Sequence, residues 1–394
     1  MLLRLRRLAV PALVVAGAIY VACAGFGVQT MGDYPRLFAS STNALLAGHL
    51  GLFFRELPED AAGGSVLLRA PAALLAKLLF GGQLAIFRFG ALESVLALGG
   101  VGLWLARGMR ASGGSVLARA AVVGLCVIAP ALLDAILFGH PEEALGAALC
   151  VAAVLLADGE HPAIAGVALG LAIINKPWGI FAIAPTLLAA RHGRVLIATL
   201  AVAITGAWLA TAHLVAPGHF AHSLNALTSV VHSQELWWPL AHLASSPGLT
   251  PAYALPAFIG AHARGLVVLA AAALAVPLAR RPARTAEDCL ALLALVFLLR
   301  CMLDPSDHVY YHLPFVIALL AWESRARGAP ILALLATGLL WLVFHTVSGV
   351  AGLDVQFLAY TAVTVPFVVV LARTALGRTA SRRDALPAQP AAAL

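Results

Sequence analysis

The sequence predicts an all-α, polytopic integral membrane protein of about twelve helices. Of its 394 residues, 62% are hydrophobic and only 11% are charged, whereas a soluble domain carries roughly 25% charged residues. Apolar runs of about 18–20 residues recur from end to end, and each is long enough to cross a hydrocarbon core of about 30 Å as a helix. Lipid offers no partner to backbone polar groups, so the spans are expected to be helical.

The apolar runs give the order of the predicted spans. We expect them at 8–28, 84–106, 118–137, 143–157, 162–175, 178–190, 196–216, 264–279, 286–303, 309–322, 329–349 and 356–376. The fifth and sixth runs are short for a full crossing at about 1.5 Å per residue. A broken or re-entrant pair is the alternative interpretation, because Pro177 and Gly179 interrupt the helix at NKPWG.

The basic residues indicate how the spans are oriented. The net charge is +7, and 17 of the 25 lysines and arginines fall on the N-terminus, the C-terminal tail and alternate connections. The positive-inside rule makes that side cytoplasmic, so the protein is predicted to be a multi-pass plasma (cell) membrane protein with both termini cytoplasmic. This topology accounts for the positive net charge, so no nucleic-acid partner is expected. We expect one transmembrane domain over 1–376 and a disordered cytoplasmic tail over 377–394.

Two long loops then fall on the extracytoplasmic side, at 29–83 and 217–263. In the first loop, 35–50 and 66–80 mix apolar residues with polar or basic ones, as helices that lie in the membrane interface do. The first apolar run is interpreted as a retained span rather than a cleaved signal peptide, because the chain beyond it is itself a membrane protein.

Ionisable residues gather at the predicted extracytoplasmic ends of the spans. Charged groups near membrane depth are costly and are therefore candidates for function. They are Asp33 after the first span, His140, Glu142 and Glu143 after the third, Lys176 between the fifth and sixth, and Arg300, Asp304, Asp307, His308, Tyr310, Tyr311 and His312 at the ninth-to-tenth turn. The five cysteines include no CxxC pair, so neither a zinc nor a redox site is expected.

Three stretches follow an order that is found in one class of enzymes. GDYPRLFASSTNALLAGHLGLF, followed by LLRAPAALLAKLLF, resembles the first loop of GT-C-fold glycosyltransferases that use polyprenyl-phosphate sugars. The central stretch from GHPEEALG to LLAARHGR and the later DPSDHVYYHLP are similar to glycosyltransferase family 87, the polyprenol-phosphate-mannose-dependent α-mannosyltransferases. Two departures stand out. Asp33 is alone where many GT-C enzymes carry an acidic pair, and LLRAP replaces the usual Tyr-Pro start of the second surface helix.

The resemblance implies a GT-C-like enzyme that moves a sugar, with mannose the first choice, from a polyprenyl-phosphate donor to a lipid-linked or glycan acceptor on the extracytoplasmic face. Such a donor carries a phosphate leaving group, so an inverting displacement needs only one base to take the acceptor proton. We expect Asp33 to be that base. Fixed positive charge or donors would stabilise the phosphate, and the candidates are Lys176, Arg300 and His308.

The remaining candidates are expected to contact the substrates. They are Tyr34, Arg36, Arg69, His140, Glu142, Tyr310, Tyr311 and His312. Tyr310 and Tyr311 are equally consistent with an aromatic belt at the membrane interface. A divalent metal is not required, because no spacing of the acids demands one, although Asp304 with Asp307, or Glu142 with Glu143, could contribute oxygen ligands.

Structural interpretations compete with each of these roles. Asp33 could simply end the first span in water, and Lys176 could extend to the interface. Arg300 and Asp304 are four residues apart on a helix and could form a local ion pair. For the whole chain, the rivals are a transporter or flippase of a polyprenyl or lipid-linked substrate, and a non-catalytic subunit of an envelope-assembly complex.

Overall fold

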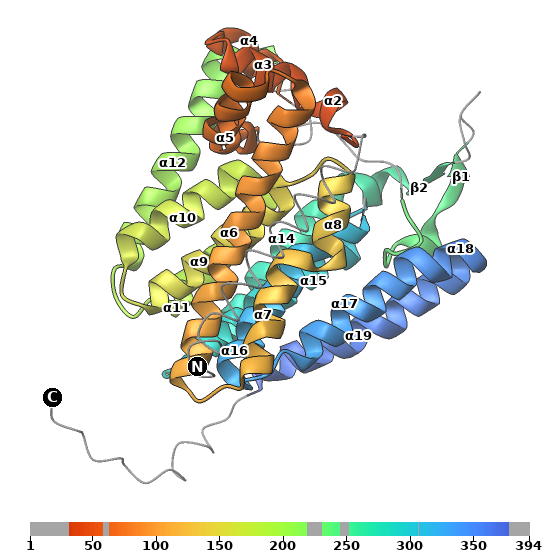
Figure 1. The fold of residues 1–394 in the computed structure, drawn as a ribbon. Coiled ribbons are helices and arrows are strands. Elements are labelled where there is room, and N and C mark those ends of the chain that lie inside the picture. The colour runs from red at the N-terminus through yellow and green to blue at the C-terminus, as the bar shows by residue number, and fades with distance from the viewer. Residues whose placement is uncertain (1–30, 58–62, 219–230, 245–251, 306, 378–394) are drawn as a thin grey trace, which may run out of the picture.

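The computed structural model describes residues 31–57, 63–218, 231–244, 252–305 and 307–377. Its regular elements are helices apart from one short β-hairpin (Figure 1), so the all-α prediction is confirmed. They are α2 (Tyr34–Leu37), α3 (Ala39–Leu46), α4 (Leu50–Arg55), α5 (Gly64–Phe80), α6 (Gln83–Ala111), α7 (Val116–Ile128), α8 (Pro130–Leu137), α9 (Glu142–Asp158), α10 (Pro162–Asn175), η1 (Pro177–Ala182), α11 (Ile183–Ala189), α12 (Arg194–Val215), η2 (Trp238–Leu240), β1 (His242–Ala244), β2 (Ala252–Ala254), α14 (Ala257–Ala279), α15 (Ala286–Leu303), η3 (Val309–His312), α16 (Leu313–Ala326), α17 (Ile331–Trp341), η4 (Leu342–Val347), α18 (Ser348–Val350) and α19 (Leu353–Leu376).

Six described helical segments are long and apolar enough to cross a membrane, namely 83–111, 116–137, 194–215, 257–279, 331–350 and 353–376. Each coincides with a predicted span, which confirms a multi-pass membrane protein. The predicted spans at α9, α10 and α16 also form helices, but these are only 17, 14 and 14 residues long. Helix α15 carries three charged residues. The count of twelve crossings and the side on which each end lies stay predictions.

Prolines explain two breaks in the helices. Pro130 is the first residue of α8, and the residue before it, Ala129, is extended, so α7 and α8 are separate. Pro177 opens η1, and Lys176 before it is extended with φ −157° and ψ 135°. A residue that precedes proline is driven out of the helical region by the proline ring. The interruption expected at NKPWG is present, and it leaves Lys176 at a helix end.

Helices α9, α15 and α16 form the interior of the bundle (Figure 1). Nearly all of their residues are buried, including Phe297, Phe315 and Trp322. The faces of α12, α14, α17 and α19 expose many leucines and valines, as the lipid-facing side of a membrane protein does. The predicted first span at 8–28 and most of the tail, 378–394, lie outside the described residues.

The segments that were expected as surface helices pack at one end of the bundle. Helices α2 to α5 lie beside the start of α6 and the end of α12 (Figure 1), where Phe53 and Phe54 contact Trp208. In α5, Leu78, Leu79 and Phe80 are exposed, which suits contact with lipid. At the same end of the bundle, the ends of α8, α10 and α15 meet the starts of α9 and η3, and the polar candidates come together there.

Candidate active site

Asp33 is positioned by a backbone contact between two segments that are distant in sequence. Its amide donates a hydrogen bond to the carbonyl oxygen of Phe138, with an N···O distance of 2.9 Å. Gly32 and Gly139 flank this contact, with φ of +52° and +86°. A Cβ on Gly32 would lie 2.2 Å from the carbonyl carbon of Phe138, and one on Gly139 would lie 2.6 Å from the amide nitrogen of Tyr34. Glycine permits both the left-handed backbone and the close approach.

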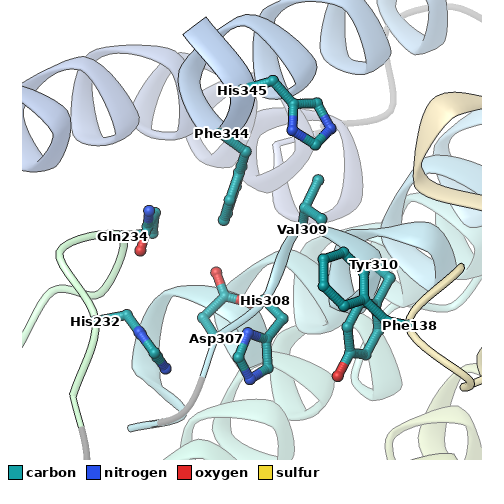
Figure 2. Close-up of a pocket in the computed structure, with 9 residues that line it drawn as sticks. All are labelled: Phe138, His232, Gln234, Asp307, His308, Val309, Tyr310, Phe344 and His345. Atoms are coloured by element: carbon teal, nitrogen blue, oxygen red, sulfur yellow. The ribbon is translucent and has the colours of Figure 1, made fainter. Parts of the chain in front are cut away.

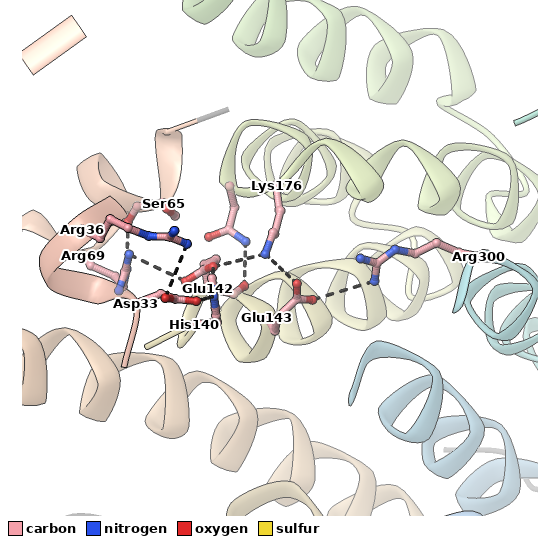
Figure 3. A network of polar contacts seen from close by, with 10 residues as sticks. Asp33, Arg36, Ser65, Arg69, His140, Glu142, Glu143, Lys176 and Arg300 are labelled. Carbon is pink, nitrogen blue, oxygen red and sulfur yellow. Dashed lines mark hydrogen bonds and ion pairs between the residues drawn. The ribbon is translucent and has the colours of Figure 1, made fainter. Parts of the chain in front are cut away.

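Behind Asp33, a chain of charged groups runs into the bundle (Figure 3). Asp33 Oδ2 lies 3.6 Å from Nε2 of His140, and Nδ1 of His140 lies 2.8 Å from Oε1 of Glu142. The same Glu142 oxygen accepts a hydrogen bond from Nζ of Lys176 at 3.2 Å, and Lys176 donates a second one to Glu143 at 2.7 Å. Apart from Asp33 these residues are buried, where a low dielectric strengthens their interactions.

Two arginines flank the two glutamates. Arg69 Nη2 lies 4.0 Å from Oε2 of Glu142, and Arg300 Nη1 lies 4.0 Å from Oε2 of Glu143. Neither carboxylate oxygen has a hydrogen-bond partner among the described residues, so these long pairs leave the arginines with donors to spare. Together with Lys176, three buried cations face two buried carboxylates. The excess positive charge favours an anion, because an uncompensated buried charge is costly.

The network has one exposed end. The side chain of Asp33 is 47% exposed, and that of Arg36, with Nη2 at 3.5 Å from Asp33 Oδ1, is 76% exposed. The side chains of Arg69, Glu142, Glu143, Lys176 and Arg300 are at most 9% exposed. A substrate that arrives from outside therefore meets the Asp33 carboxylate first.

A stack of imidazole and phenol rings lies beside the charged network. His140 stacks on Tyr310 with ring centroids 4.8 Å apart, and Tyr310 stacks on His308 at 5.4 Å. Tyr311 packs edge-on against Tyr310 and lies under the guanidinium of Arg300, 4.6 Å from its ring centroid. The expected aromatic cluster is therefore inside the protein beside the charges, which makes a belt at the lipid interface the weaker interpretation of these tyrosines.

A cavity of about 190 Å³ opens beyond this stack (Figure 2). It is lined by Phe138, His232, Gln234, Asp307, His308, Val309, Tyr310, Phe344 and His345. Glu235 joins the two loops that form one wall, because its Oε1 accepts hydrogen bonds from the amides of His232 and Asp307 at 3.0 and 2.9 Å. The ring of Phe138 lines this cavity, and its backbone carbonyl accepts the hydrogen bond from the Asp33 amide. One residue therefore forms part of the cavity wall and also positions Asp33.

Burial alters the protonation of two groups at this cavity. Burial lowers the pKa of His308 to about 4, helped by the neighbouring His232, His140 and Lys176. His308 is therefore neutral at pH 7, so its expected contact with a phosphate would be that of a hydrogen-bond donor rather than a cation. Burial also raises the pKa of Glu235 to about 8, which lowers the negative charge beside the cavity at neutral pH.

The structure brings most of the predicted site residues together and separates two of them. Tyr34 is buried against Phe87, and its hydroxyl accepts a hydrogen bond from Gln83 at 3.3 Å. His312 is fully buried, with Nε2 2.9 Å from the Tyr360 hydroxyl. Both face the protein interior. The proposed pair of Arg300 with Asp304 is not formed in the described residues, because Arg300 faces Glu143 instead. Asp304 lies 3.7 Å from Arg264.

The sequence did not predict the roles of several residues that build the site. Glu143 was expected only as an acid that could contribute to a metal site, yet it accepts the shorter of the two hydrogen bonds from Lys176, at 2.7 Å. Asn175, whose amide donates to the backbone carbonyl of Glu142 at 2.9 Å, precedes Lys176 in the NKPWG stretch. Phe138 and Gly139 belong to the FGHPEE turn. A glycine beside an aromatic residue in this polar turn could have indicated a close backbone contact, but no role was predicted for either residue.

One further cluster could hold a metal ion within the described part of the chain. Ligand atoms of Cys301, Asp307 and His312 lie within 4.8 Å of one another, and all three residues are buried. The hydroxyl of Tyr360 already donates to Asp307 Oδ2 at 3.3 Å and pairs with His312. Oδ2 of Asp307 and Nε2 of His312 thus have a partner, whereas Oδ1 of Asp307 and Nδ1 of His312 have none among the described residues. The question of metal use stays a prediction.

The fold and this network define an integral membrane protein with a half-exposed carboxylate backed by buried cations at one end of its bundle. The sequence model of glycosyltransferase family 87 matches residues 63–305. This is more than half of the chain, and the chain belongs to that family. It is a membrane glycosyltransferase. The match covers the turn from Phe138 to Glu143, Lys176 and Arg300, whereas Asp33 and the turn from Asp307 to His312 lie outside it. A search of curated proteins found no match.

Proposed function

We propose that the protein transfers a sugar, with mannose the first candidate, from a polyprenyl-phosphate donor to a hydroxyl of a lipid-linked or glycan acceptor. The reaction takes place with inversion at the extracytoplasmic face of the cell membrane. The observation that carries this proposal is a carboxylate, Asp33, at the exposed end of a buried network with excess positive charge. A displacement on a phosphate-activated sugar needs these two features together, a base and a counter-charge.

Asp33 acts as the general base. The acceptor hydroxyl approaches from the aqueous side and loses its proton to the carboxylate as its oxygen forms a bond to the anomeric carbon. The bond between that carbon and the phosphate oxygen breaks, and the phosphate leaves as an anion without protonation by an acid. His140 lies on the far side of the carboxylate at 3.6 Å and is anchored by Glu142, so it orients Asp33 toward the exposed side.

The donor phosphate binds against the cations of the network. Arg36 is the exposed cation beside Asp33, and Arg300 has donors that its 4.0 Å pair with Glu143 does not use fully. Lys176 is already bonded to both glutamates at 3.2 and 2.7 Å, so its charge supports the site mainly by holding them. Arginine presents a planar fork that matches phosphate oxygens. These cations supply the charge stabilisation, so the proposal requires no divalent metal.

A transporter of a polyprenyl or lipid-linked substrate is the second candidate. The interruption between α10 and η1 at Lys176 favours it, because broken helices with an ionisable residue line many transport sites. A transporter needs no base at an exposed mouth, whereas a transferase does. Membership in a glycosyltransferase family makes transfer the stronger candidate.

The test is a direct search for the product. Membranes that contain the protein are incubated with defined polyprenyl-phosphate sugars, and lipid extracts are compared by mass spectrometry with membranes that contain Asp33→Asn. The proposal expects a new glycolipid or glycan one hexose heavier, made only by the unaltered protein. Movement of the donor across the bilayer with no such product would favour the transporter.

A further inference from the structure

The cavity beyond the ring stack has unused hydrogen-bonding capacity. Oδ1 of the buried Asp307 has no hydrogen-bond partner among the described residues, and the partly exposed side chains of Gln234, His232 and His308 line the same cavity. Buried polar groups are nearly always bonded, and those that are not call for an occupant. Donors and acceptors of the described residues therefore converge on this cavity.

Aromatic rings supply the apolar part of the lining. Tyr310, Phe138 and Phe344 border the same cavity, and Figure 2 shows Gln234 and His232 on one side of it with Tyr310 and Phe138 on the other. Phe138 and Tyr310 are themselves in contact, with ring centroids 5.7 Å apart. A ligand that fits this lining has apolar C–H surface to lie on a ring and several hydroxyl groups at its edge.

The charges around the cavity disfavour other ligands. The described lining contains no lysine or arginine, so it offers no fixed counter-charge for a phosphate. Asp307 adds a carboxyl group whose pKa burial raises, so it offers hydrogen bonds to hydroxyl groups rather than a counter-charge. A lipid tail would leave the four polar side chains without partners, at a cost for each. The volume of about 190 Å³ is below the roughly 300–1,000 Å³ of drug-sized sites, which suits one ring rather than a chain.

We propose that this cavity binds a single neutral hexose ring, with Gln234, Asp307 and His308 bonding its hydroxyls and Phe344 stacking on its face. The inference rests on the proposed transferase function for its place in the reaction. The connection to Asp33 is structural, because Phe138 lines the cavity and also accepts the hydrogen bond from the Asp33 amide. A ring held here belongs to either the donor or the acceptor, and both present the same chemistry.

Sugar binding can be measured without any turnover. The full chain in lipid nanodiscs is titrated with methyl α-D-mannopyranoside, and saturation-transfer NMR reports contact with the ring protons. We expect saturation in the unaltered protein and in the control Phe258→Leu, whose ring is 74% exposed on α14. Gln234→Ala and Phe344→Leu should weaken binding by roughly tenfold, the loss expected when one hydrogen bond or ring contact is removed. Thermal unfolding shows whether each variant is folded.

Equal saturation in Gln234→Ala, Phe344→Leu and the control would overturn the assignment of this cavity. Competition then identifies the source of the ring. Displacement of the probe by polyprenyl-phosphate mannose, but not by polyprenyl phosphate, indicates the donor sugar, whereas displacement by a mannosylated glycolipid indicates the acceptor. Displacement by neither would overturn the role of the cavity as a substrate subsite. Sugar binding without any product in the transfer assay would refute the transferase proposal and leave the binding site intact.

Discussion

The amide of Asp33 is bonded to the carbonyl of Phe138 across 105 positions of sequence, at 2.9 Å. This bond joins the first described turn to the turn between α8 and α9, from which His140 and Glu142 also come. The carboxylate is consequently held on the same rigid segment that places its neighbours. A flexible loop could carry an aspartate to the membrane surface, but it could not hold the carboxylate 3.6 Å from His140.

Gly139→Ala should reduce transfer by about 10²-fold, because a shift of about 1 Å at a catalytic group costs that much. Its Cβ would lie 2.6 Å from the carbonyl oxygen of Met31 and push the Asp33 turn away. Gly113→Ala is the matched control, since Gly113 also has positive φ, +82°, but open space around its Cβ position. It should lose only the roughly 1–2 kcal/mol that a left-handed backbone costs alanine. Initial transfer rates and unfolding midpoints are measured for both variants. Equal transfer rates would show that the contact between the Gly139 turn and the Asp33 turn does not position the carboxylate.

Lys176→Met should destabilise the protein by about 3 kcal/mol, because it removes the closest fixed cation from both buried glutamates and leaves Glu143 with Arg300 at 4.0 Å as its nearest cation among the described residues. The double variant Lys176→Met with Glu143→Gln should recover part of this loss, since it also removes the buried negative charge that lost its 2.7 Å partner. Unfolding free energies in detergent measure both effects. If the double variant were less stable than the single one by the full cost of Glu143→Gln alone, the two residues would not be coupled.

Stability should fall as the pH drops from about 6.5 to 4, in part through His308. Its pKa is near 6.5 when unfolded and about 4 when folded, because of burial and the nearby His232, His140 and Lys176. Between these values the unfolded chain binds more protons than the folded one, so acid favours unfolding, and the effect levels off below pH 4. His308→Gln should flatten this part of the profile by on the order of 3 kcal/mol. Replacing the exposed His49 by glutamine is the control, and identical profiles for all three proteins would contradict the assignment.

The fold class was predictable because long apolar runs allow few structures in a membrane. The gathering of Asp33, His140, Glu142, Lys176 and Arg300 was predictable as well, since alternating spans bring every second turn to the same end of a bundle. The partners of each charge were not. Lys176 bonds two glutamates that lie 33 and 34 positions earlier, and only the packing of α9 against α10 decides that pairing.

Local spacing did not predict the partner of Arg300. Arg300 and Asp304 are separated by the distance that suits a helical ion pair, but α15 ends at Leu303 and Asp304 is already extended. The two side chains therefore do not share a helix face, and Arg300 faces Glu143 on α9. The cavity was also beyond prediction, because its lining comes from loops and helix ends spread from Phe138 to His345.

The proposed base gives the sharpest prediction. Asp33→Asn keeps the shape of the side chain and its backbone bond to Phe138 but cannot accept the acceptor proton, so transfer should fall by on the order of 10² or more. Asp33→Glu should recover little, because the carboxylate moves by about 1 Å relative to a clamped backbone. Glu56→Gln is the control, since Glu56 is an acid of the same region whose carboxylate accepts a hydrogen bond from Ser40, at 3.0 Å, on the surface.

Rates of hexose transfer from a defined polyprenyl-phosphate donor compare the four proteins, and donor binding is measured in parallel. Binding should persist in Asp33→Asn, because the phosphate is held by the cations rather than by the base. If Asp33→Asn retained full activity while Glu142→Gln or Asp307→Asn abolished it, the base would lie deeper in the protein. The exposed end of the network would then serve only to admit the substrate. If Asp33→Asn lost donor binding together with activity, Asp33 would instead be part of the donor site, because a pure base is needed only after the donor has bound.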